Sequence, residues 1–298
     1  MNINAALRTC LVVLIVSASC SKAAVEETYR NYDIAGRLEK VYAGDGEYSV
    51  IHITQKAEEP RIKQFQIWYP AELKSSSRSW PLVVLANGTG VPASSYEPIF
   101  RHLASWGFIV IGNEDSNSWD GLTTSISLKY MLTENQSSES VFYGKVDTDA
   151  VGLAGHSQGG VAVFNAATLF DNAKYYKALC AQSCTSQDLA ENLQWPYSVE
   201  KVNAPTLLMA GAGNSDSGLI CPLESMDYNY DHISGQPVMM GRLVGTEHGD
   251  VLKRGDAYLT AWFMYYLYGD AQAAECFEGD NAEMFSNTSW QDVKHKNL

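Results

Sequence analysis

Positive charge is scarce in this 298-residue sequence, and long apolar runs and internal repeats are missing from it. Lys and Arg together number 21 against 34 Asp and Glu, which leaves a formal net charge of -13. A general nucleic-acid-binding protein needs a basic face, as does a protein that binds anionic membranes, so the charge argues against both. Without a repeat, a low-complexity tract or a composition change, residues 24–298 are predicted to form a single domain.

The first 23 residues carry the pattern of an export signal. Arg8 supplies positive charge, residues 11–16 form a short apolar core, and small residues follow it. The apolar core is too short to span a bilayer. We therefore expect a secreted or periplasmic protein, with a first core strand or helix as the alternative interpretation. Cys20 is a candidate for lipid attachment, the only membrane link expected, although Ser17 stands where such signals usually carry leucine.

Four cysteines remain once this signal is removed: Cys180, Cys184, Cys221 and Cys276. In an exported protein they suggest two disulfides, for which three connectivities exist. We favour Cys180 with Cys184 and Cys221 with Cys276. The second bridge would pin the C-terminal segment and contribute about 4 kcal/mol. No histidine lies at zinc-ligand spacing from the two close cysteines, so a zinc site is not expected.

Strand-like and helix-like segments alternate along the chain, which is typical of a mostly parallel sheet covered by helices. Strands are expected at residues 34–42, 48–55, 62–69, 81–86, 108–111, 151–154, 176–181, 205–210 and 237–240. Helices are expected near residues 95–105, 121–134, 157–170 and 254–268. Short polar turns join the first three strands, which predicts an antiparallel lead-in. The later strands are apolar throughout, as expected where helices cover both faces of a sheet.

A serine between glycines follows one of these strands, in the segment "VGLAGHSQGG" at residues 151–160. The pattern G-x-S-x-G marks a sharp strand-to-helix turn that exposes the serine hydroxyl. Glycine is needed two positions before and after the serine, because a side chain there would strike a neighbouring element. Ser157 is therefore the candidate nucleophile. A helix-capping serine is the alternative, and it is compatible with the same turn.

A serine hydroxyl needs a base within hydrogen-bond reach, and in enzymes with this turn the histidine comes last in the chain. Three histidines lie downstream of Ser157. His248 follows the end of an expected strand, residues 239–244, and lies in a glycine-flanked loop, where the imidazole can project. His232 follows a polar run and His295 lies in a charged tail. His248 is therefore the candidate base.

The orienting carboxylate should follow the strand at residues 205–210. Asp216 lies in the loop "GAGNSDSG" directly after it. A buried carboxylate beside the base fixes the tautomer of the imidazole and stabilises the imidazolium. The alternatives to Asp216 are Glu224, Asp227 and Asp231.

An oxyanion hole requires two N–H donors directed at the developing negative charge. One is expected from the backbone of Gln158, the residue after the nucleophile. The other is expected from the loop "NGTG" after residues 81–86, with Thr89 first and Gly88 second. Gly88 and Trp119, in the loop after residues 108–111, are candidates for contact with the substrate.

Four segments, "LASWGFIVIGNEDSNS", "GHSQGG", "APTLLMAGAGNSDS" and "TEHGD", resemble the α/β-hydrolases grouped with dienelactone hydrolases, cutinase-like polyester hydrolases and chlorophyllases. The resemblance covers roughly residues 62–268. It implies hydrolysis of a small-molecule or polymeric ester through an acyl-enzyme, with no metal or organic cofactor. We expect the protein to be a monomer. Dienelactone hydrolases proper use cysteine where this chain has Ser157. Polyester hydrolases carry an aromatic residue, a methionine and a tryptophan where this chain has Thr89, Gln158 and residues 182–184.

The favoured hypothesis is an exported serine carboxylic-ester hydrolase. A lipase or a serine peptidase with the same triad is an alternative within the enzymes. A non-catalytic binding protein of the same fold would be indicated by the loss of a triad member, but Ser157, Asp216 and His248 are all present. Halide or epoxide chemistry on this fold needs an aspartate at the turn, which Ser157 argues against.

Overall fold

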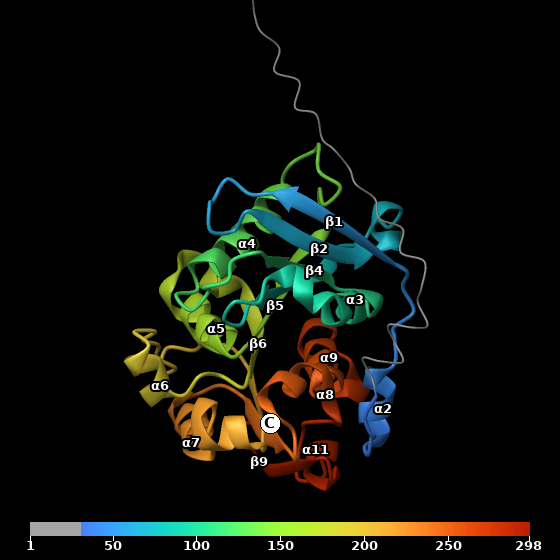
Figure 1. The fold of residues 1–298 in the computed structure, drawn as a ribbon. Helices are drawn as coiled ribbons and strands as arrows, with labels where there is room; N and C mark the ends of the chain where they lie inside the picture. The colour runs from blue at the N-terminus through green and yellow to red at the C-terminus, as the bar shows by residue number, and fades with distance from the viewer. Residues whose placement is uncertain (1–30) are drawn as a thin grey trace, which may run out of the picture.

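The computed structural model describes residues 31–298, and a nine-stranded sheet runs through them (Figure 1). The strands are ordered β1-β2-β4-β3-β5-β6-β7-β8-β9. The predicted signal at residues 1–23, with Cys10 and Cys20, lies outside the described residues. Within residues 31–298, no helix combines the length and the apolar character that a membrane crossing requires.

The sheet is parallel from β4 to β8 and antiparallel at both edges. Its strands are β1 (Val50–Lys56), β2 (Gln64–Pro70), β3 (Trp80–Ala86), β4 (Ile109–Asn113), β5 (Val146–His156), β6 (Tyr176–Gln182), β7 (Thr206–Gly211), β8 (Val238–Leu243) and β9 (Trp290–Lys296). β2 pairs antiparallel with both β1 and β4, as the short polar turns predict. The predicted α/β class with a mostly parallel sheet is confirmed.

Helices cover both faces of this sheet (Figure 1). They are α2 (Arg37–Ala43), α3 (Glu97–Ser105), α4 (Leu122–Glu134), α5 (Gln158–Leu169), α6 (Gln187–Asn192), α7 (Leu223–His232), α8 (Val251–Arg254), α9 (Asp256–Phe263), α10 (Ala271–Ala274) and α11 (Glu283–Ser286). Each of the four predicted helical regions contains a helix. The prediction of a strand at residues 34–42 is wrong, because α2 occupies this segment. Glu39 accepts the Gly36 N–H at 3.0 Å, and Leu38 and Tyr42, one turn apart, are both buried.

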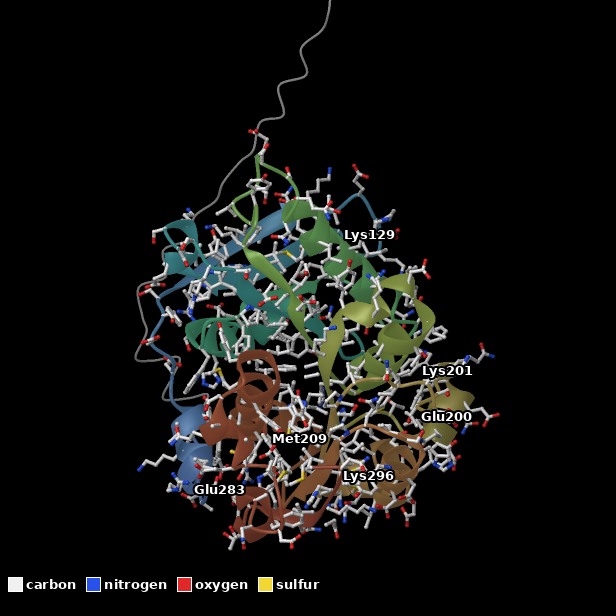
Figure 2. The ribbon with its side chains drawn as sticks, turned by 180° about the vertical axis from the view of Figure 1, so that it is seen from behind. Lys129, Glu200, Lys201, Met209, Glu283 and Lys296 are labelled. Atoms are coloured by element: carbon white, nitrogen blue, oxygen red, sulfur yellow. The ribbon has the colours of Figure 1, made fainter. Side chains whose placement is uncertain are left out.

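Successive residues of the central strands point to opposite faces of the sheet and are buried on both. In β3, Leu82 and Val84 pack into the core beneath α4, α5 and α7, while Val83 and Leu85 pack beneath α3, α9 and α2. Figure 1 shows these two groups of helices on opposite sides of the sheet. Met209 of β7 lies in the interior, whereas Lys129 lies at the outer edge (Figure 2). The double burial explains why these strands are apolar throughout.

The structure corrects the predicted disulfides, because all four cysteines are free and buried. Cys184 and Cys221 pack into the core beneath α4, α5 and α7. Cys180 and Cys276 pack into the core on the opposite face. Each favoured pair therefore has one member on either side of the sheet, where the two sulfur atoms cannot meet.

The C-terminal segment forms the last strand of the sheet rather than a solvated tail. β9 pairs antiparallel with β8, and Trp290 at its start is 6% exposed. The His295 ring, placed in a charged tail by the sequence, lies 5.2 Å from the ring of Phe285. The strand is hard to recognise in the sequence because most of its residues are polar and only Trp290 is fully buried.

Candidate active site

Ser157 forms the turn between β5 and α5 in a backbone conformation that is rare for a residue with a side chain. Its φ is 61° and its ψ is -120°. A Cβ atom on Gly155 would lie 2.2 Å from the Gly159 carbonyl oxygen, and one on Gly159 would lie 2.3 Å from that of Ala86. The backbones therefore approach too closely for side chains at these two positions. The geometry is that of a nucleophile elbow.

Loops after β7 and β8 bring Asp216 and His248 together. His248 Nδ1 lies 2.7 Å from Asp216 Oδ1. The Asp216 carboxylate is completely buried, whereas the His248 side chain remains 18% exposed. A carboxylate oxygen accepts, so Nδ1 is the donor and Nε2 is left as the acceptor that a base requires.

The second oxygen of Asp216 is held by two further donors. Asp216 Oδ2 accepts from the Ser183 hydroxyl at 2.7 Å and from the Gly211 N–H at 2.8 Å. Ser183 is buried, with a φ of 43°. These bonds stabilise a carboxylate that has no contact with water. The sequence carries no signal for this role, because it depends on an unusual backbone turn after β6.

The elbow contacts the His248 loop through His156, the residue before Ser157. His156 Nε2 lies 2.9 Å from the His248 carbonyl oxygen, and the two imidazole rings are 4.4 Å apart. No hydrogen bond from Ser157 Oγ is recorded within residues 31–298. Catalytic hydroxyls often take up their bond to the base only when substrate binds.

The His156 ring is electrically neutral at neutral pH. Burial, together with a smaller effect of the neighbouring His248, lowers the pKa of His156 from 6.5 to about 4. Desolvation disfavours the charged form of an imidazole, which explains the direction. The site therefore holds two adjacent imidazoles of which only His248 is paired with a carboxylate.

The structure distinguishes the two candidate donors in the loop after β3. The Gly88 N–H donates to Tyr96 Oη at 2.9 Å and is occupied. Thr89 is exposed, and within the described part of the chain no acceptor is recorded for its N–H or for that of Gln158. The loop of Thr89 approaches the elbow at His156, so these two N–H groups are the candidates for an oxyanion hole.

The Gln158 side chain points away from solvent and binds the loop that follows β4. It is completely buried, its Oε1 accepts from the Ser118 N–H at 2.8 Å, and its Nε2 donates to Asn117 Oδ1 at 3.2 Å. The Ser118 hydroxyl donates to the Asn87 carbonyl at 2.6 Å, in the loop that carries Thr89. The side chain of Gln158 thus helps to hold the two loops together, a role beyond the N–H expected from the sequence.

Arg61, on the connection between β1 and β2, holds the same loop from outside. Its guanidinium lies 3.0 Å from Asp115 and 2.7 Å from Asp120, and donates to the Asn117 carbonyl at 2.7 Å. The hydrogen bond to Asp120 is the largest cause of a raised pKa for Arg61. The arrangement fixes the loop through three contacts on one planar cation.

Trp119 packs against the core instead of standing free in the loop. Its side chain is partly buried on the face covered by α5, and its carbonyl accepts from Asn165 Nδ2 at 2.8 Å. Its contact with substrate stays a prediction.

The alternatives to His248 and Asp216 lie elsewhere. His232 ends α7, where its Nδ1 lies 2.8 Å from the Tyr228 carbonyl oxygen, and His295 lies on β9. The alternative carboxylates all belong to α7: Glu224, Asp227 and Asp231. Within residues 31–298, no group of three or more His, Cys, Asp or Glu side chains is arranged to hold a metal ion.

A mostly parallel sheet with a serine elbow after β5, and with aspartate and histidine in later loops, defines an α/β-hydrolase. Comparison with protein families then identifies the group: the PET hydrolase-like family matches residues 40–281, well over half of the chain, and the chain belongs to it. The predicted resemblance to cutinase-like polyester hydrolases is confirmed, and membership assigns the chain to the ester hydrolases. A comparison with curated proteins gives no match.

Proposed function

We propose that this protein is an exported serine carboxylic-ester hydrolase that forms an acyl-enzyme on Ser157. The observation that carries the proposal is the 2.7 Å contact between His248 Nδ1 and a completely buried Asp216, on loops next to the elbow of Ser157. Export rests on the pattern of residues 1–23. The presence of Ser157, Asp216 and His248 argues against a binding protein of the same fold.

In the first half of the reaction, Nε2 of His248 takes the proton of the Ser157 hydroxyl as its oxygen attacks the ester carbonyl. The carbonyl oxygen becomes an oxyanion, which the N–H groups of Thr89 and Gln158 stabilise. Asp216 stabilises the imidazolium formed on His248. The imidazolium then gives its proton to the departing alcohol, and the acyl group remains on Ser157.

In the second half, His248 takes a proton from water as the water oxygen attacks the acyl carbonyl. The same two N–H groups hold the second oxyanion. His248 returns the proton to Ser157 Oγ, which releases the carboxylic acid and restores the enzyme. No group outside the described site is required for either step.

Hydrolysis of p-nitrophenyl esters of graded chain length tests this function. The wild type should release p-nitrophenol, and Ser157→Ala should lose nearly all of this activity. Asp227→Asn serves as the matched control, because Asp227 is a carboxylate on α7 whose partner is Lys294. A wild type inactive on the whole series, or a Ser157→Ala variant as active as wild type, would contradict the proposal. Preference for short chains would indicate a small acyl pocket, and preference for long chains a lipase-like or polymer-directed one.

A further inference from the structure

His156 ends β5 and is the residue directly before Ser157. Its side chain is 7% exposed, so it forms part of the floor of the site rather than its surface. Its Nε2 lies 2.9 Å from the carbonyl oxygen of His248, and its ring packs against the His248 ring at 4.4 Å with a tilt of 39°. One side chain therefore contacts both the backbone and the ring of the candidate base.

The contact with the His248 carbonyl defines the protonation of His156. A carbonyl oxygen only accepts, so Nε2 of His156 must carry a proton. Burial lowers the pKa of His156 to about 4, so Nδ1 carries none at neutral pH. A neutral ring at this place adds no positive charge beside His248 when that residue becomes an imidazolium.

The other ring nitrogen of His156 faces the loop that carries Thr89. A Cβ atom on Gly88 would lie 3.6 Å from His156 Nδ1 and 3.1 Å from Tyr96 Oη. The Gly88 N–H donates to that same Tyr96 oxygen. The His156 ring thus lies between the oxyanion loop and the His248 loop.

The backbone of His248 lies in an exposed segment. His248 begins a short turn at residues 248–250, and both Glu247 and Gly249 beside it are exposed. Its N–H donates to Ser215 Oγ at the long distance of 3.3 Å. Its carbonyl bond to His156 is shorter and leads directly to the strand that carries the nucleophile.

We propose that His156 is a positioning residue that ties the backbone of His248 to β5 and thereby fixes the base relative to Ser157. The proposal rests on the proposed function. If His248 is displaced, the reaction slows. Substrate binding stays the same, because His156 is buried beneath the site and does not contact the substrate. A displacement of about 1 Å lowers rates by about a hundredfold, so loss of this tie should lower kcat and leave KM unchanged.

Two amide substitutions separate the hydrogen bond from other effects. In His156→Gln the side-chain nitrogen can reach the position of Nε2, whereas in His156→Asn it reaches only the position of Nδ1. We expect kcat for p-nitrophenyl ester hydrolysis to fall about 10- to 100-fold in His156→Asn, and to recover to within about threefold of wild type in His156→Gln. KM should be the same in all three proteins, and the melting temperatures of the two variants should agree.

Equal kcat values in His156→Gln and His156→Asn would overturn the proposal, as would a loss that follows the melting temperature. Wild type and Ser157→Ala are measured in the same assay. Hydrolysis by wild type but not by Ser157→Ala supports the proposed function whatever the His156 variants do. The two ideas therefore fail on different measurements.

A second measurement depends on neither activity nor the folding of variants. ¹⁵N NMR of the histidine-labelled wild type at pH 7 should show His156 protonated at Nε2 and bare at Nδ1, with the Nε2 proton slow to exchange. A ring protonated at Nδ1 alone, or averaging between both tautomers, would contradict the bond to the His248 carbonyl.

Discussion

Two histidine–aspartate contacts in this molecule share one geometry and differ in their surroundings. His248 Nδ1 lies 2.7 Å from Asp216, and His102 Nδ1 lies 2.8 Å from Asp256, between α3 and the start of α9. The His248 side chain is 18% exposed, whereas that of His102 is 1% exposed. The same pair of residues at the same distance therefore occurs both at the candidate site and inside the core.

The second ring nitrogen separates the two pairs. His102 Nε2 lies 2.8 Å from the Gly44 carbonyl oxygen and 3.2 Å from Trp106 Nε1, so it is enclosed by protein. For His248 Nε2, no partner is recorded in the part of the chain that the structure describes. A catalytic base needs a ring nitrogen without a hydrogen-bond partner beside the nucleophile. A buried histidine that joins two helices needs hydrogen-bond partners for both ring nitrogens. The comparison supports the proposed catalytic role of His248–Asp216, whereas His102–Asp256 joins α3 to α9.

The largest expected effect distinguishes the two aspartates. Asp216→Asn should lower kcat/KM for p-nitrophenyl esters about 10⁴-fold, because the amide no longer holds the required tautomer of His248. Asp256→Asn should leave kcat/KM within a few-fold of wild type. Steady-state kinetics on both variants measure the difference, and a comparable loss in each would erase the distinction.

The next effect concerns stability. His102→Phe leaves Asp256 buried without its partner, and breaking a buried pair in this way costs about 3 to 5 kcal/mol. We therefore expect a fall of about 4 kcal/mol in the free energy of unfolding, measured with urea, at unchanged kcat. His232→Phe, at an exposed position, is the control and should change the stability little. Loss of activity in folded His102→Phe would argue for a functional link between the pairs.

The pH dependence of stability should reveal the buried His156. The folded-state pKa of His156, about 4, lies below its ordinary value of 6.5. As the pH falls from 6.5 to 4, the unfolded chain therefore binds a proton that the folded protein does not, and His156 removes about 3 kcal/mol of stability. Unfolding of wild type and His156→Gln at pH 7 and pH 4 measures this, and the variant should lose about 3 kcal/mol less. Equal losses would mean that His156 titrates normally.

The smallest effect is expected at Ser183, whose hydroxyl donates to the second carboxylate oxygen of Asp216. Within the described residues, the Oδ1 atom of Asp256 has no such donor. Ser183→Ala removes one of the donors to Asp216 Oδ2 and should lower kcat about tenfold. Ser125→Ala is the control, because its hydroxyl donates to Asn172 and to no member of the triad. An unchanged kcat in Ser183→Ala would show that the contacts with His248 and Gly211 are enough to position the Asp216 carboxylate.

Much of the fold could be predicted from the sequence because strands buried on both faces must be apolar. The segments that failed were those for which this signal is absent. α2 is a short amphipathic helix of two turns, in which Glu39 accepts the Gly36 N–H, and β9 is polar at every position except Trp290 and Val293. Neither carries a long apolar run, so pattern alone could not place them.

The candidate site was predicted where chain order and a glycine motif constrain it, at Ser157, Asp216 and His248. The roles of His156 and Ser183 arise from three-dimensional packing and have no local pattern. The cysteines show the same limit. Cys180 and Cys184 are an even number of residues apart and would share a face if β6 continued, but β6 ends at Gln182 and the positive φ of Ser183 breaks the alternation.

The central claim is that His248 activates Ser157 while His102 does not. Labelling with a fluorophosphonate, followed by mass spectrometry of the peptides, tests it most directly, because the reagent reacts with an activated serine hydroxyl. The account predicts a single adduct on Ser157 that forms at the wild-type rate in His102→Phe and is nearly abolished in His248→Ala and Asp216→Asn. An adduct on another residue, or equal labelling of Ser157 without His248, would contradict it.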